Sequence, residues 1–496
     1  MLTPAELTRL CVPRGTTSIV ADPHEIANVC GVDGISYMLE ASEGLPINAY
    51  FMLPSCVPAT PHDESGAVLY AKELEPFYKE KRVLGLAEMM NFPGVLMDAP
   101  DVVEKIRRAR DNGKVVDGHA PLLTGKALDK YISAQIGSDH ECSRLDEAKE
   151  KISKGQWVMI RQGTAARNLY DLMGLFETPY DRRCFLATDD RHPADLANEG
   201  HIDNIIRLAV KYGASAVRAI RMASLQAAEY FGIRYVGAIA PGYRADVVVL
   251  SDLDEVKVEN VYVRGEKVVS DGKMKSFDAP AVSDALKERV YNSFNVDVLT
   301  PSDFHIEERA ERCRVIGVIA GQLVTEEKIE KIKWEKNNGV DLERDILKLA
   351  VIERHNNTGH RGLGFIEGIG MKRGAIASSV SHDSHNLIVI GTNDEDMAIA
   401  ANTVREFGGN AVVVDGKVVS SMSLPVAGLM ADCSGEEIAR ANAEVREAVH
   451  TLGVPKEIEP FMNMAFVSLS VIPFVKMTTE GLVDVNQQKK ISLYVD

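Results

Sequence analysis

Short apolar runs alternate with amphipathic helical patterns over the first 235 residues of the sequence. Helical stretches such as residues 101–113 and 124–135 separate most of these runs. This alternation is typical of repeated βα units, whose parallel sheet is buried on both faces. The predicted strands span residues 16–21, 49–53, 82–88, 114–118, 136–139, 157–161 and 184–189.

An eight-stranded (β/α)8, TIM-like barrel is the fold that this pattern favours at this length. The pattern provides seven strands, and the first of them begins close to Met1. Either a weak strand escapes the pattern, or the first barrel strand is missing from this sequence. We therefore expect an α/β barrel over residues 1–235.

The sequence pattern changes after the barrel region. Residues 236–275 alternate apolar and polar side chains with turn signals between them, which predicts part of a small antiparallel β domain. Residues 276–496 have a mixed pattern and predict a C-terminal α/β domain. Within it we expect a helix over 343–355, and a hairpin that turns at Asp415 and Gly416.

Charge and cysteine usage limit the classes of partner. The 56 basic and 72 acidic residues give a net charge of −16, so we expect neither a nucleic-acid nor a membrane partner but a small substrate. The seven cysteines include no Cys-x-x-Cys motif, which favours a cytoplasmic location. The longest apolar run, residues 464–475, is too short to span a bilayer and contains Pro473.

Histidines and acidic residues gather where the predicted strands end. His119 and His140 follow successive strands, and in a parallel barrel such positions share one rim. Imidazole and carboxylate groups together suit Mn, Fe or Zn, and the share of carboxylates favours Mn or Fe. The candidate residues at this rim are Asp22, His24, Glu88, His119, Asp139, His140, Glu141, Arg161, Asp189 and Asp190.

The alternative for each acidic residue is a helix cap or a solvated loop position. That alternative is at least as good as a site role for Asp22 and Asp190. The two histidines also have a plain alternative as polar residues of ordinary βα loops.

Several short sequence motifs resemble a known protein family more specifically than the strand pattern does. They include ADPHEIANV, YMLEASEGLP, EMMNFPGV, DGHAP, SDHE, TDDRHP and SVSHDSHN. With these phrases the sequence resembles the adenine deaminases of the amidohydrolase superfamily nearly from end to end. The resemblance implies an enzyme that hydrolyses adenine to hypoxanthine and ammonia, in adenine catabolism and purine salvage. It also implies a cytoplasmic location and a divalent metal ion, for which Mn is preferred over Fe or Zn.

The resemblance also implies roles for individual residues. Glu88, His119, His140 and Asp189 correspond to metal ligands, and Asp189 also to the proton shuttle. Glu141 corresponds to a residue that protonates or holds a ring nitrogen of the base. Substrate-binding candidates are Asp22, His24, Arg161, His382 and His385, although the two last fit a hydrogen-bonded turn at least as well.

One part of the family pattern has no counterpart here. In the family a first-strand His-x-His precedes the LTPAEL phrase, whereas this sequence opens at Met1 just before it. We therefore expect two metal ligands of a binuclear centre to be missing, through a start codon assigned at an internal methionine or through a shortened protein. The alternatives are an inactive purine-binding or interaction protein, and an amidohydrolase of another heterocycle such as cytosine. Family members often form homo-oligomers, so we expect one.

Overall fold

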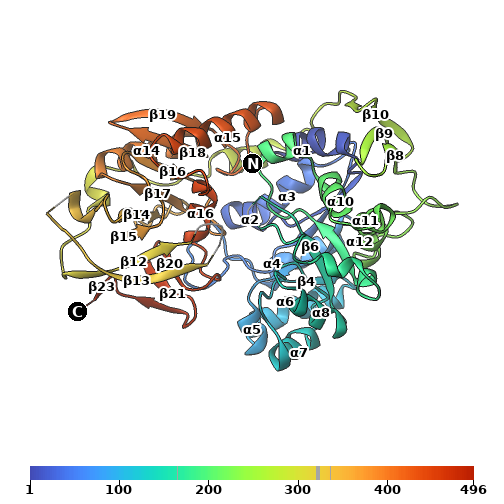
Figure 1. Ribbon diagram of the computed structural model, residues 1–496, viewed down its shortest axis with the longest axis horizontal. Helices are drawn as coiled ribbons and strands as arrows, with labels where there is room; N and C mark the ends of the chain where they lie inside the picture. Colours follow the sequence, from blue (N-terminus) through green and yellow to red (C-terminus); the bar gives the residue numbers. More distant parts are fainter. Residues whose placement is uncertain (165, 320–323, 336, 496) are drawn as a thin grey trace.

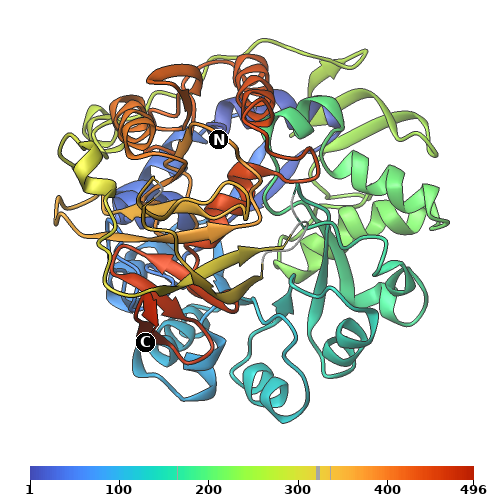
Figure 2. The ribbon, with the colours of Figure 1, turned by 60° about the vertical axis from the view of Figure 1, so that its left-hand side comes forward.

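The computed structural model describes residues 1–164, 166–319, 324–335 and 337–495. Figure 1 shows two lobes side by side, with the N-terminal half of the chain on the right and the C-terminal part, in yellow to red, on the left. Figure 2 brings the C-terminal part in front of the other lobe. In the described part of the chain, no helix has the length and apolar character needed to cross a membrane.

The N-terminal lobe is built on parallel strands, one for each strand that the sequence predicts. They form two ladders, β1-β2-β3-β4 and β5-β6-β7. The two ladders meet where Gly137 donates a backbone hydrogen bond to Val116 at 2.8 Å. The strands are β1 (Ser18–Ala21), β2 (Asn48–Leu53), β3 (Val83–Met89), β4 (Val115–Gly118), β5 (Ser138–Asp139), β6 (Trp157–Arg161) and β7 (Cys184–Ala187).

Helices connect these strands and bury one face against them. In α6 (Pro100–Asp111), Val102, Ile106 and Ala109 follow helical spacing and join the core behind β3 and β4. The other helices of this lobe include α2 (His24–Cys30), α3 (Val32–Ala41), α7 (Gly125–Ser133), α8 (Leu145–Ser153), α10 (Ile202–Lys211), α11 (Ala216–Ala223) and α12 (Leu225–Tyr230). The seven predicted strands and the helices predicted over 101–113 and 124–135 are thereby confirmed. Between β6 and β7, where a helical stretch is also predicted over 167–176, the described residues have only short 3-10 turns at Met173–Phe176 and Tyr180–Arg183.

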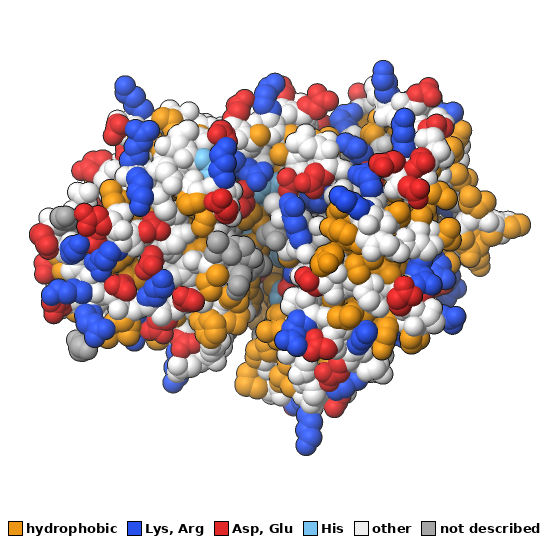
Figure 3. Space-filling view, viewed as in Figure 1, with side chains coloured by type: hydrophobic (Ala, Val, Ile, Leu, Met, Phe, Trp, Pro, Cys, Tyr) orange, Lys and Arg blue, Asp and Glu red, His pale blue; other side chains and the backbone are white. Residues whose placement is uncertain are grey.

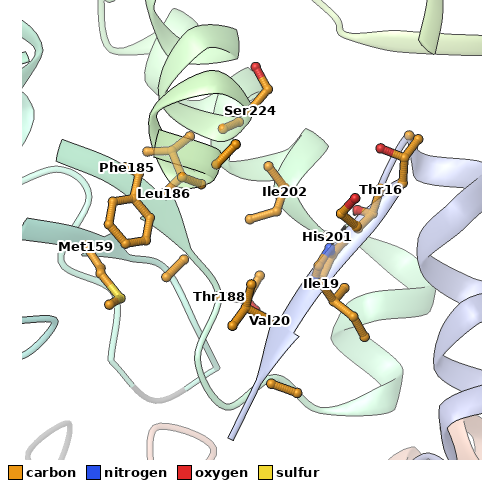
Figure 4. A pocket seen from close by; sticks show the side chains of 18 of the residues that line it. Thr16, Ile19, Val20, Met159, Phe185, Leu186, Thr188, His201, Ile202 and Ser224 are labelled. Carbon is orange, nitrogen blue, oxygen red and sulfur yellow. Dashed lines mark hydrogen bonds between the residues drawn. The ribbon is translucent and has the colours of Figure 1, made fainter. Parts of the chain in front are cut away.

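The barrel wall is open between its first and last strands. No ladder pairs β1 with β7 among the described residues, and a cavity of about 710 Å³ lies between them. Ile19 and Val20 face this cavity from one side and Phe185 and Leu186 from the other (Figure 4). The cavity is therefore walled mainly by apolar side chains of two unpaired strand edges.

Residues 236–275 contain the predicted antiparallel strands. They are β8 (Val247–Asp252), β9 (Lys257–Val263), β10 (Glu266–Ser270) and β11 (Lys273–Met274), in the order β11-β10-β9-β8. Val261 and Val263 pack there against Leu45 and Ile47, which join this sheet to the barrel.

A nine-stranded sheet forms the centre of the C-terminal part. Its inner strands are apolar on both faces because helices and a small sheet cover them from opposite sides. Seven of its strands lie in the order β12-β15-β14-β17-β16-β18-β19, with β13 and β23 beside β12. The bounds are β12 (Arg312–Val318), β13 (Thr325–Lys331), β14 (Leu347–Ile352), β15 (Arg361–Glu367), β16 (Ala375–Ser378), β17 (Leu387–Gly391), β18 (Asn410–Val414), β19 (Lys417–Met422) and β23 (Tyr494–Val495).

The helix predicted over 343–355 is wrong. This segment contains β14, which pairs with both β15 and β17 and is buried at all six positions. A short apolar run has no clear period, so a strand buried on both faces resembles a buried helix in the sequence. The predicted hairpin is confirmed, because β18 and β19 pair across Asp415 and Gly416, both of which have positive φ as a type I′ turn requires.

Two long helices cover opposite faces of this sheet. Residues of α14 (Asp394–Phe407) pack with Ala350 and Val389, whereas residues of α15 (Gly435–His450) pack with Leu349 and Ile388. Because neighbouring strand positions point to opposite faces, the two helices cannot share one side. The remaining elements are α16 (Pro460–Val467) and the small sheet of β20 (Val475–Thr478), β21 (Gly481–Asp484) and β22 (Lys489–Ile491). The domain boundaries predicted at residues 235 and 275 stay predictions.

A buried ion network fixes the rim near β5. Lys151 Nζ lies 2.9 Å from Asp139 Oδ2 and 2.6 Å from Glu147 Oε1, and the side chains of Lys151 and Asp139 are fully buried. Asp139 also accepts hydrogen bonds from the backbone of Ala120 and Glu141. Asp139 therefore balances the charge of the buried Lys151 and fixes the backbone at Ala120 and at Glu141, in two segments of the rim.

We expect Asp139→Ala to lower the free energy of unfolding by about 3 kcal/mol, because it leaves Lys151 with one carboxylate and frees two buried N–H groups. Asp146→Ala is the matched control, since its ion pair with Arg144 is exposed. Thermal unfolding midpoints compare the two variants. Equal midpoints would contradict the importance of the network.

Candidate metal centre and active site

Two histidines and one glutamate meet at the rim formed by the strand ends. Glu88 lies in β3, His119 follows β4 and His140 follows β5. Glu88 Oε2 lies 2.8 Å from His119 Nδ1 and 3.0 Å from His140 Nε2. The donor atoms of the three side chains all lie within 4.8 Å of one another. The predicted neighbours Glu88, His119 and His140 are thus brought together.

The surroundings fix the orientation of both imidazoles. His140 Nδ1 lies 3.1 Å from the Gly118 carbonyl and donates to it, which leaves Nε2 facing Glu88. The His119 backbone N–H donates to the hydroxyl of Tyr131 at 3.0 Å. The two rings pack edge to face, with centroids 5.3 Å apart. A carbonyl behind a histidine is the usual way to present the opposite nitrogen to a metal.

Electrostatics couple these groups strongly. Burial by itself would raise the pKa of Glu88, but His140 and His119 hold this pKa well below its ordinary value. Burial opposes the charged form of His140 as well, yet Glu88 and Glu141 raise the pKa of His140 well above its ordinary value. The pKa of His119 is also raised, against burial, by Glu141 and Glu88. The protons on the two histidines therefore balance the buried carboxylates.

Asp189, Glu141 and Arg161 form the adjoining side of the rim. Arg161 Nη1 lies 2.6 Å from Asp189 Oδ2 and also contacts Glu141 Oε1, while Nη2 donates to Glu141 Oε2 at 2.9 Å. His140 Nε2 lies 3.4 Å from Glu141 and 3.9 Å from Asp189. His140, Glu141 and Asp189 make a second group with donor atoms within 4.8 Å. The predicted site residues Glu141, Arg161 and Asp189 are thus also brought together at the rim.

Asp22 and His24 approach the same centre from the end of β1. His24 Nδ1 lies 2.9 Å from Asp22 Oδ2 and 3.8 Å from Glu88 Oε1. Asp22, His24 and Glu88 again have donor atoms within 4.8 Å of one another. Asp22 is thus part of the rim cluster, although it also accepts a hydrogen bond from the backbone of His24 in the manner of a cap.

The C-terminal part reaches this rim through a residue that the sequence pattern did not single out. His382 Nδ1 lies 2.6 Å from Glu25 Oε1, and His385 Nε2 contacts Glu25 Oε2. His382 and His385 thus approach the rim through Glu25 in α2, next to His24. Figure 3 shows histidine side chains in the hollow between the two lobes. The one available signal for Glu25 was its position directly after His24 in the ADPHE phrase.

The cavity between β1 and β7 extends to this rim. Glu88, His140 and Asp189 line it together with the apolar side chains of Figure 4. An apolar space that ends on a few polar groups is the usual form of a small-molecule site. A small organic substrate could therefore bind with one end against Glu88, His140 and Asp189.

The donor set fits a divalent metal ion. Two oriented imidazoles and a carboxylate lie within 4.8 Å of one another at Glu88, His119 and His140, with Asp189 at the side. Mixed imidazole and carboxylate ligands suit Mn, Fe and Zn. A cation here would replace the protons that now balance the carboxylates.

We expect the affinity for Mn²⁺ to rise from pH 6 to pH 8, by about tenfold per pH unit for each proton displaced. The sign follows from the raised pKa values of His119 and His140, because both must lose a proton before they bind a metal. Equilibrium dialysis at several pH values measures this slope. His140→Asn should reduce the dependence of the Mn²⁺ affinity on pH, whereas His305→Asn, which changes an exposed histidine, should leave it unchanged. An affinity independent of pH would contradict the assignment.

Comparison with known protein families agrees with both halves of the structure. Residues 1–268 match the amidohydrolase family, and residues 322–489 match the adenine deaminase C-terminal domain. Among solved structures, a β-aspartyl dipeptidase from Fervidobacterium islandicum AW-1 aligns with 55% of this chain and 79% of its own, at 15% identity and a TM-score of 0.42.

Curated relatives match nearly the whole chain. "Adenine deaminase 2" of Carboxydothermus hydrogenoformans is 46% identical over 98% of this chain and 85% of its own length. The adenine deaminase of Desulfatibacillum aliphaticivorans is 45% identical over 100% of this chain and 86% of its own. The adenine deaminase of Clostridium acetobutylicum is 45% identical over 98% of this chain and 85% of its own length. The chain therefore belongs to the adenine deaminase family of the amidohydrolases.

Proposed function

We propose that this protein hydrolyses adenine to hypoxanthine and ammonia with the help of a divalent metal ion. The observation that carries the proposal is the convergence of Glu88, His119, His140 and Asp189 at one rim, in a chain about 45% identical to adenine deaminases. The reaction replaces the exocyclic amine at C6 of the purine by the oxygen of water.

The proposed metal ligands are Glu88, His119, His140 and Asp189, and the proposed metal is Mn, with Fe or Zn as substitutes. When bound, such a cation lowers the pKa of water and supplies a nucleophile near neutral pH. Glu88 Oε2 already contacts both imidazoles, so the ligands need little movement. Whether the centre holds one ion or two stays a prediction.

Asp189 is the residue that we propose to move protons. Its Oδ2 lies 3.9 Å from His140 Nε2 and 2.6 Å from the Arg161 guanidinium, at the edge of the ligand cluster. In this position the carboxylate can accept the proton of the attacking water and return it to the departing amine. Arg161 holds the Asp189 carboxylate in position during both proton transfers.

Glu141 is proposed to hold the base rather than to protonate it. Burial would raise its pKa, but His119 and Arg161 hold this pKa far below the ordinary value, so Glu141 remains ionised. An ionised carboxylate accepts a hydrogen bond from a ring N–H and cannot donate one. Asp22, His24, His382 and His385 are proposed to line the substrate side of the rim.

The remaining expectations about partners stay predictions. They are a homo-oligomeric assembly, a cytoplasmic location, and the absence of nucleic-acid and membrane partners. The net charge of −16 supports the last of these.

Among nucleobases we expect the Mn-loaded protein to have its highest kcat/KM for adenine. Ammonia release and the change in ultraviolet absorbance on formation of hypoxanthine measure turnover. Cytosine and a hydantoin serve as competing substrates of the same chemical type. A higher kcat/KM for either of them would make the substrate assignment wrong.

We expect Asp189→Asn to lower kcat by at least about a hundredfold, because the amide cannot carry the proton. Asp171→Asn, which changes an exposed aspartate in the same lobe, is the matched control and should retain full activity. Metal content is measured on the same samples, so that loss of the proton carrier is separated from loss of the ion. Near-normal turnover by Asp189→Asn would refute its role.

A further inference from the structure

The two lobes meet at a carboxylate in the first turn of α2. Glu25 contacts His382 and His385, which lie 357 and 360 positions further along the chain. The side chains of the two histidines are 8% and 1% exposed, so both are held inside the junction. Their contacts orient the Glu25 carboxylate.

The barrel side of this junction presents an imidazole in the manner of a metal ligand. His24 Nδ1 lies 2.9 Å from Asp22, and His24 Nε2 lies 3.4 Å from Glu25 Oε1. Asp22 lies beside Nδ1 without a hydrogen bond to it among the described residues, and Nε2 faces Glu25. Nε2 is therefore the nitrogen that His24 presents to the junction.

The C-terminal side adds a buried acid, Asp383. Asp383 is 4% exposed, and no donor among the described residues satisfies its Oδ2. A buried carboxylate oxygen without a donor is unfavourable, because it has lost its hydration without gaining a hydrogen bond. Donor atoms of His24, Glu25 and Asp383 all lie within 4.8 Å of one another. A cation at this point would give the unsatisfied oxygen its partner.

We propose that His24, Glu25 and Asp383 form a further divalent-cation site at the junction of the two lobes. It shares no ligand with the set Glu88, His119 and His140, and one of its ligands, Asp383, comes from the C-terminal part. One imidazole and two carboxylates suit Mn, Fe or Zn. The proposal does not depend on which base the enzyme deaminates.

The electrostatic environment of Asp383 agrees with this geometry. Burial, together with the negative charges of Glu25 and Glu88, raises the pKa of Asp383 to about 7 despite the nearby His24. Burial is the largest cause of this shift, because it opposes the charged form of the carboxylate. A divalent cation would favour the ionised form of Asp383.

The segment that carries Asp383 is rigidly held. Ser379 donates to the Gly428 carbonyl at 2.6 Å, and the hydroxyls of Ser381 and Ser468 lie 2.5 Å apart. Asn386 donates to the Glu64 carbonyl of the barrel lobe at 2.7 Å. Since the ligands are positioned by their surroundings, a cation would bind without rearrangement of the segment. It would also tie the C-terminal part to the barrel rim.

The test counts Mn²⁺ ions per chain by equilibrium dialysis and elemental analysis. We expect Asp383→Asn to bind one ion fewer than the wild-type protein, or to bind that ion at least about tenfold more weakly. Glu25→Gln, which keeps the shape of the side chain, should lose the same ion. Asp297→Asn changes an exposed aspartate of the C-terminal part and should bind Mn²⁺ as the wild type does.

A second readout separates this site from the strand-end ligands. In His119→Asn, which weakens the strand-end set, Mn²⁺ should still raise the unfolding temperature, because the junction ion binds only the folded protein. In the double variant His119→Asn/Asp383→Asn this rise should disappear. An unchanged ion count in both Asp383→Asn and Glu25→Gln would overturn the proposal, whatever the result for deaminase activity.

Discussion

The parallel pairing of the strands is the constraint on which the rest of this structure depends. Within their two ladders the strands β1 to β7 run in the same direction, so they end at the same rim, and side chains from distant segments meet there. Glu88 shows the consequence, since one of its oxygens contacts imidazoles that follow two different strands. In a sheet with antiparallel order, His119 and His140 would end on opposite edges.

Electrostatic balance explains why so many ionisable groups can share this rim. The carboxylates raise the pKa values of His119 and His140, and Arg161 lies between Glu141 and Asp189. The same physics makes the rim suitable for a metal, because a cation can take the place of protons that already neutralise buried carboxylates. The junction with the C-terminal part repeats this arrangement around Glu25, with His24 and Asp383 as neighbours.

Much of the barrel could be predicted from the sequence, because strands and helices there have distinct periods and lengths. The strand ends indicated a set of acidic residues and histidines at one rim, and the family resemblance singled out Glu88, His119, His140 and Asp189 among them as metal ligands. The C-terminal sheet is harder to predict from the sequence. Strand β14 is buried on both faces, and its sequence lacks the alternation of a half-exposed strand, so the pattern predicts a helix there.

The sequence by itself determined the parallel βα order of the first lobe, the histidines and acidic residues at its strand ends, and the family. The tertiary structure alone decided which of these side chains touch. It paired Arg161 with both Glu141 and Asp189, and it brought His382 and His385 onto Glu25 across more than 350 residues. It also left Asp383 Oδ2 without a hydrogen-bond partner among the residues that the structure describes. The physical reason is that local periodicity encodes the strand and its end, whereas contacts between lobes arise from the packing of separate segments, which no local pattern records.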